Sequence, residues 1–146
     1  MSYPVLLTVH LFAALMFVGT VFFEVLILEG VRKHVPRDAM RVIEIAIGTR
    51  ARRIMPWVLL LLYSAGIAMA WQHRAALAHP FESSFGLLLT IKIVLALSVF
   101  GHFLSAMTLQ RKGKLRSVHF KYIHLSVFCH MVGIVLLAKA MFYLHW

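Results

Sequence analysis

Four long apolar stretches constrain the fold of this chain more than any other feature of its sequence. They cover about residues 3–28, 54–71, 85–109 and 120–143. An α-helix needs roughly 20 apolar residues to cross a hydrocarbon layer of about 30 Å. The stretches lack the alternating pattern of barrel strands, so each one predicts a transmembrane helix. The sequence therefore predicts an all-α integral membrane protein, a four-helix bundle that forms a single domain over residues 1–146.

The composition agrees with the bilayer as the solvent of this chain. Hydrophobic residues make up 62% of the sequence, whereas a soluble domain has roughly 45–50%. The single cysteine, Cys129, excludes an internal disulfide and a Cys-x-x-Cys metal motif. The first stretch has no basic segment before it and no small-residue cleavage site after it, so we expect no cleavable signal peptide.

The basic residues predict how the chain is oriented in the membrane. The net charge is +10, but the lysines and arginines are concentrated in two of the three segments between the stretches. Under the positive-inside rule, this places the first and third loops in the cytoplasm of a bacterial-type inner membrane and both termini outside. The same distribution argues against nucleic acid as a partner. The basic residues are Arg32, Lys33, Arg37, Arg41, Arg50, Arg52 and Arg53 in the first loop, and Arg111, Lys112, Lys114, Arg116 and Lys121 in the third.

Residues 38–47 predict a short amphipathic helix within the first cytoplasmic loop. Its basic and acidic residues lie away from one apolar face. We expect an interfacial helix that rests on anionic lipid headgroups, and the alternative is an element that binds a partner protein. The apolar face consists of Ala39, Val42, Ile43, Ala46 and Ile47.

Three of the four stretches contain a histidine far from either end: His10, His102 and His130. An imidazole in hydrocarbon costs free energy unless a partner satisfies it. With the orientation above, His102 and His130 lie at similar depth in the inner half of two antiparallel helices. Such a pair suits the axial ligands of a haem or two ligands of a metal ion. The alternative is a hydrogen-bonded pair that helps the helices associate.

Further candidates lie at other depths. His10 belongs to the outer half, either as a ligand or proton relay or as an interhelical hydrogen-bonding group. Lys92 also lies in the outer half, where it either extends toward the surface or meets an anionic group such as a haem propionate. His124 is a possible metal ligand nearer the inner surface. A single cofactor that spans His10, His102 and His130 is therefore not expected.

Two Met–His pairs lie near the outer ends of the second and fourth stretches. Met69 and His73 are four residues apart, and so are Met141 and His145. That spacing places each pair on one helix face, and a thioether beside an imidazole suits Cu(I). The alternatives are an apolar filler for each methionine and a solvated side chain for each histidine.

The segment His10-Leu-Phe-Ala-Ala-Leu-Met-Phe-Val-Gly19 resembles the opening helix of the copper-resistance protein D (CopD-like) superfamily, which tends to read His-Leu-x-Ala-Ala-x-x-Trp-x-Gly. The likeness continues at Arg50–Trp71, where a basic run precedes an apolar span with an interior glycine, and at Leu87–Lys92. Phe17 stands where that family usually has Trp, and Thr20 replaces a second glycine. The resemblance implies copper handling and functional roles for His10 and Lys92.

The related small membrane protoporphyrinogen oxidases, for which haem b is the expected cofactor, are similar over nearly the whole chain. The similarity is carried by Arg53-Ile-Met-Pro56, by Lys92 with His102, and by Val135-Leu-Leu-Ala-Lys139. The Pro-Phe that follows this last segment in the oxidases is missing here. His124 stands near the place of their Asn-Glu pair.

Three roles are compatible with these features. The first is copper binding, transport or resistance, in which buried histidines pass copper inward from the outer face. The second is a b-type haem protein for electron transfer or substrate oxidation, with His102 and His130, or His10, as axial ligands. The third is a structural or assembly subunit. The expected partners are the lipid bilayer and copper or haem b, with a homo-oligomer or a partner membrane protein left open. Enzymatic activity and any catalytic residue also stay open.

Overall fold

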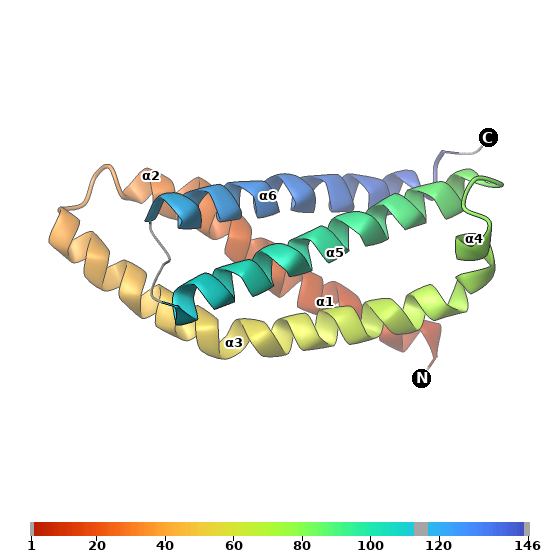
Figure 1. Cartoon of the computed structure of the whole chain (residues 1–146), viewed down its shortest axis with the longest axis horizontal. Coiled ribbons are helices and arrows are strands. Elements are labelled where there is room, and N and C mark those ends of the chain that lie inside the picture. The colour runs from red at the N-terminus through yellow and green to blue at the C-terminus, as the bar shows by residue number, and fades with distance from the viewer. Residues whose placement is uncertain (1, 113–116, 145–146) are drawn as a thin grey trace. The chain divides into compact units, whose positions relative to one another are not determined.

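The computed structural model describes residues 2–112 and 117–144, and of residues 117–120 it describes the backbone alone. Every regular element in these residues is a helix (Figure 1). The chain divides into two compact units, Met1–Gln72 and His73–Trp146, which are described separately below. The elements are α1 (Tyr3–Phe22), the π-helix η1 (Phe23–Leu28), α2 (Glu29–Val31), α3 (Arg37–Gln72), α4 (Arg74–Ala78), α5 (Ser84–Arg111) and α6 (Ser117–Ala140).

Four helical segments in the described residues are long and apolar enough to cross a membrane. They are Tyr3–Val31, Arg37–Gln72, Ser84–Arg111 and Lys121–Ala140. The predicted class, an all-helical multi-pass membrane protein, is confirmed at this level. The first segment is longer than expected because α1, η1 and α2 follow one another without a break. The sidedness of the termini and the single-domain bundle stay predictions.

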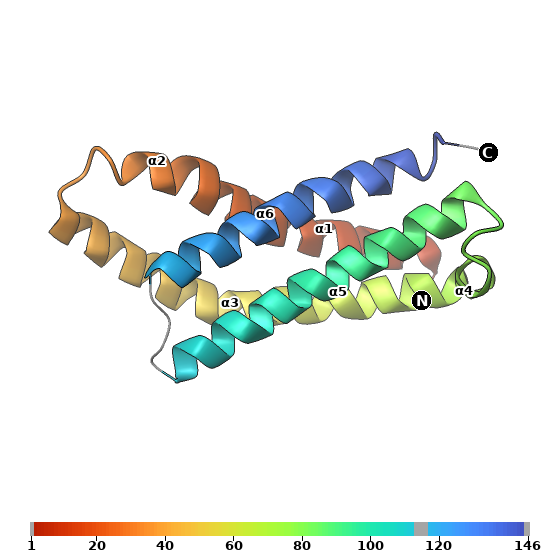
Figure 2. The ribbon, with the colours of Figure 1, turned by 45° about the horizontal axis from the view of Figure 1, so that its top comes forward.

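In the first unit, α1 packs along α3, and the two run side by side in both views (Figures 1 and 2). The buried residues of α1 recur at spacings of seven and four, so they form one stripe of the helix. Val58, Leu59 and Ala65 are the buried residues in the membrane-spanning part of α3. The buried α1 residues are Leu6, Ala13, Phe17 and Val21.

The segment predicted as an amphipathic loop helix is the first part of α3 rather than a separate element. With 36 residues, α3 is about 54 Å long, so it extends beyond a hydrocarbon layer of about 30 Å unless it is strongly tilted. Of the predicted apolar face, Ile47 is half-buried, while the other four residues are exposed. Its contact with lipid headgroups stays a prediction.

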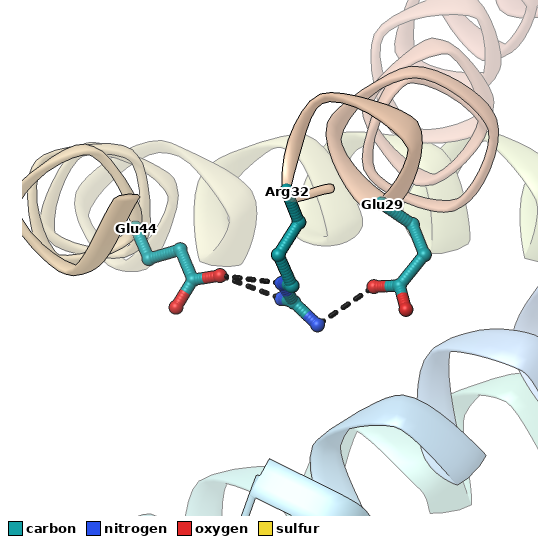
Figure 3. A network of polar contacts seen from close by, with 3 residues as sticks. All are labelled: Glu29, Arg32 and Glu44. Carbon is teal, nitrogen blue, oxygen red and sulfur yellow. Dashed lines mark hydrogen bonds and ion pairs between the residues drawn. The ribbon is translucent and has the colours of Figure 1, made fainter. Parts of the chain in front are cut away.

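An exposed ionic network spans the turn between α2 and α3 (Figure 3). The Nη1 atom of Arg32 donates to Glu29 Oε2 at 2.7 Å, and its Nη2 donates to Glu44 Oε1 at 2.6 Å. The side chains of Arg32 and Glu44 are 41% and 38% exposed, and pairs in such positions contribute roughly 0–1 kcal/mol. The network therefore orients the turn more than it stabilises the unit.

In the second unit, α5 and α6 run antiparallel and side by side (Figures 1 and 2). Near the start of α5 and the end of α6, Leu88, Leu89 and Met141 form a buried cluster against Phe85 and Leu137. At the same end, Ser84 Oγ donates to the Leu144 carbonyl at 2.7 Å. This polar contact holds the C-terminal turn against the first residue of α5.

Substituting Gly86 with alanine is expected to destabilise the second unit. An added Cβ would lie 2.8 Å from the Ala76 carbonyl oxygen and 3.1 Å from Ser83 Oγ. The Ala76 oxygen is a backbone atom, so α4 has to move, at a cost of roughly 1–3 kcal/mol. Thermal unfolding in detergent measures this loss. Gly101→Ala is the matched control, since no atom lies within 4 Å of its added Cβ. Equal shifts for the two variants would contradict the packing argument.

Candidate functional site

The helices α5 and α6 carry the same short sequence where they face each other. It reads Leu97-Ser98-Val99-Phe100-Gly101-His102 on α5 and Leu125-Ser126-Val127-Phe128-Cys129-His130 on α6. In each copy the serine precedes the histidine by four residues, so the two side chains share a helix face. The prediction of paired histidines did not use this repeat, although it is the sequence signal for a symmetric pairing.

The two copies bind each other reciprocally. Ser98 Oγ lies 3.1 Å from His130 Nε2, and Ser126 Oγ lies 3.1 Å from His102 Nε2. The Nδ1 atoms of His102 and His130 each lie 2.7 Å from the carbonyl oxygen of the serine four residues earlier in the same helix. The centroids of the two imidazole rings are 5.4 Å apart. The structure thus brings His102 and His130 together, as their predicted depths implied.

These contacts determine where the imidazole protons are. A carbonyl oxygen only accepts, so Nδ1 of each ring carries the proton and donates it. For a neutral imidazole, each Nε2 is then an acceptor, and each serine hydroxyl donates to it. The neutral forms of His102 and His130 that fit these contacts are the Nδ1–H tautomers, in which each Nε2 faces the serine of the opposite helix.

Packing around the four polar residues keeps the two helices close. Val99 and Val127, which follow the two serines, are 2% and 7% exposed. The serines and histidines themselves are half-buried. Each serine that takes part in the polar pairs is therefore followed by a buried apolar residue.

The site offers two nitrogen ligands and little support for serine chemistry. A serine that donates to an oriented imidazole is the geometry of an activated nucleophile. However, Ser98 and Ser126 lie inside helices whose backbone N–H groups are used by the helix, so they lack the donors that an oxyanion requires. Within the described part of the chain, no group of three or more His, Cys, Asp or Glu side chains could hold a metal ion. Cys129 is exposed, and His124 is not part of any such group.

His10 belongs to a contact between α1 and α3. Its Nδ1 lies 3.0 Å from the Leu62 carbonyl oxygen. A Cβ added at Gly66 would lie 3.2 Å from His10 Cε1 and 3.3 Å from Nδ1, so the ring occupies the space that glycine leaves. The interhelical hydrogen bond, one of the two alternatives for His10, is therefore formed, while a ligand or proton-relay role stays a prediction.

Lys92 lies on α5 and is half-buried. Its ammonium group makes no hydrogen bond or ion pair with any residue that the structure describes. Binding of an anionic group by Lys92 stays a prediction.

The Met–His pairs lie where α3 and α6 end. The helix α3 ends at Gln72, so His73 lies beyond the helix that carries Met69, and the His73 ring packs edge-on against Phe85 at 5.2 Å. The helix α6 ends at Ala140, and Met141 is buried with Leu88 and Leu89. His145 lies outside the described residues. A spacing of four predicts a shared face only while the helix continues, and α3 ends before His73. Copper binding by either pair stays a prediction.

Together, the helices and the site define an all-helical, multi-pass membrane protein whose second unit holds a symmetric pair of histidines. Comparison with known protein families, with curated proteins and with solved structures gives no match to this chain. The resemblance to the CopD-like superfamily accordingly stays a prediction from its motifs. The function is argued below from the geometry of the histidine pair.

Proposed function

We propose that this protein binds copper within the membrane through His102 and His130 and passes it across the bilayer. The observation that carries the proposal is the orientation of the two rings, each held by an Nδ1–H bond of 2.7 Å to a carbonyl of its own helix. Histidines that ligate metals commonly donate their second ring nitrogen in this way, which fixes the tautomer and leaves Nε2 to bind the ion.

The separation of the rings agrees with a single ion between them. Metal–nitrogen bonds of about 2 Å place two ligating nitrogens at most about 4 Å apart. The ring centroids are 5.4 Å apart, and we propose that rotation of the two side chains brings the Nε2 atoms to that separation when the ion binds.

Copper fits this donor set better than other common ions. Structural zinc sites use four ligands, and calcium and magnesium use oxygen ligands. Imidazole suits copper, and Cu(I) is stable with as few as two ligands. Its single charge also costs less in an apolar environment than a divalent charge does. Resemblance of the first span to the CopD-like superfamily points to the same metal.

The proposal includes a place for the site in the membrane. With the basic loops in the cytoplasm of a bacterial-type inner membrane, His102 and His130 lie in the inner half of the bilayer. Copper that enters from the outer face would reach this pair before its release on the cytoplasmic side.

A b-type haem protein is the second candidate. The same Nδ1–H bonds suit axial haem ligands, and the resemblance to the small protoporphyrinogen oxidases favours haem b. A porphyrin between the two rings would, however, separate α5 from α6 and expose Val99 and Val127, which are 2% and 7% exposed. Because exposure of these apolar side chains costs free energy, we place haem second to copper as the candidate ligand.

Metal analysis and an absorption spectrum of the full chain, purified in detergent, test the proposal. We expect about one copper per chain after loading with Cu(I) and removal of excess, and no Soret band. A Soret band that shifts on reduction would contradict the copper proposal and favour a b-type haem protein. Protein that retains neither group would leave the histidines as a contact between helices and would favour a structural subunit.

A further inference from the structure

Ser98 and Ser126 use their hydroxyl groups differently from most other hydroxyls of the described helices. Within a helix, serine and threonine commonly donate to the carbonyl three or four residues earlier. Seven hydroxyls of the described helices do so: Thr8, Thr20, Thr49, Ser64, Thr90, Ser105 and Thr108. Ser98 and Ser126 instead reach an imidazole on the facing helix.

These two hydroxyls bind the Nε2 atoms of His130 and His102, which are the same atoms that would bind copper. An Nε2 lone pair that accepts a hydrogen bond at 3.1 Å is not free to ligate an ion. Copper and the two serines therefore compete for the same pair of nitrogens. The histidine orientation does not depend on the hydroxyls, since the Nδ1 atoms bond to backbone carbonyls.

We propose that Ser98 and Ser126 set the copper affinity of the site, and that their hydroxyls displace the ion from His130 and His102 during release. This inference rests on the proposed function. When the ion binds, each serine rotates to the carbonyl four residues earlier in its own helix, as the hydroxyl of Ser105 does at 2.8 Å. When the ion leaves, the hydroxyls return to Nε2. The site is then suited to transfer of copper and poorly suited to its storage.

Removing the hydroxyls is expected to tighten copper binding. Without its donor, a partly buried Nε2 is left unsatisfied, which raises the free energy of the copper-free protein. The copper-bound protein loses only a local bond to a helix carbonyl. A net hydrogen bond corresponds to about a twofold to tenfold change in an equilibrium constant. We expect this gain for each single variant, and for Ser98→Ala/Ser126→Ala a gain of about fourfold to a hundredfold.

The experiment measures the Cu(I) dissociation constant of the full chain in detergent by competition with a chromophoric Cu(I) chelator. The variants are Ser98→Ala, Ser126→Ala and their combination, and Ser105→Ala is the control because its hydroxyl donates to the Gly101 carbonyl of its own helix. Ser98→Thr keeps a hydroxyl, so it should restore an affinity close to that of the unsubstituted protein. A purely structural role would not predict tighter binding with alanine and its reversal with threonine.

Each outcome decides between the two proposals. Unchanged or weaker binding by the double variant, with copper still bound by the unsubstituted protein, overturns the inference and leaves the proposed function standing. If the unsubstituted protein and all variants bind no copper, the proposed function fails and the inference fails with it. Nitrogen NMR of the copper-free protein adds a second measurement: loss of the serine donors should shift the Nε2 signals of both histidines while Nδ1 stays protonated.

Discussion

Replacing either His102 or His130 with alanine is expected to lower the Cu(I) affinity by more than about a hundredfold, because even groups that merely orient a ligand contribute about 10–100-fold. The described residues offer no third ligand beside the pair, so one imidazole cannot hold the ion alone. Each substitution leaves one serine hydroxyl without its partner. That hydroxyl can donate to its own helix instead, so the helix pair is expected to stay folded. Copper retained after desalting, measured per chain, checks this prediction.

The matched control for the histidine substitutions is His79→Ala. His79 is an exposed residue of the same unit, and its Nδ1 lies 3.5 Å from a carboxylate oxygen of Glu82. The His79→Ala variant should bind as much copper as the unsubstituted protein does. Full copper retention by both His102→Ala and His130→Ala would mean that the pair only packs the helices.

Substituting Gly66 with leucine is expected to break the contact between α1 and α3. Even a Cβ at this position would lie 3.2 Å from Cε1 of His10, so a larger side chain has to expel the ring from the Leu62 carbonyl. Overpacking of this kind costs roughly 1–3 kcal/mol, and loss of the hydrogen bond adds about 1 kcal/mol. Reversible unfolding of the full chain in mixed detergent measures the change.

A double-mutant cycle with His10→Ala separates the steric effect from a general defect of the helix. The alanine removes the ring that leucine would displace, so Gly66→Leu should cost much less in the His10→Ala background. We expect a coupling energy of roughly 0.5–3 kcal/mol. Strictly additive effects would show that His10 and Gly66 do not share one contact.

The spans were predictable because hydropathy and helix length depend on the chain alone. The boundaries were less predictable where no residue interrupts the helix. Residues 38–47 carry the pattern of a separate amphipathic helix, but nothing between them and the second span ends a helix, so α3 runs continuously from Arg37 to Gln72. Pro56 lies inside this helix without ending it.

The candidate site was predictable in part. Depth along the two spans brought His102 and His130 to one level, and the structure places their rings 5.4 Å apart. The crossed serine bonds were not predicted, because they depend on the rotation and register of α5 against α6. The spacing of Met69 and His73 likewise did not indicate that α3 ends at Gln72, between the two residues.

By itself, the sequence determined that the chain forms long helices suited to a membrane and that two histidines lie at one depth. A backbone in hydrocarbon has to satisfy its hydrogen bonds within its own segment, so apolar length alone predicts a helix. Only the tertiary structure decided which atoms meet. The packing of α5 against α6 decides the rotation and register that bring each serine to the opposite imidazole. It also buries Met141 in the apolar cluster, because its thioether side chain packs there as an ordinary apolar group.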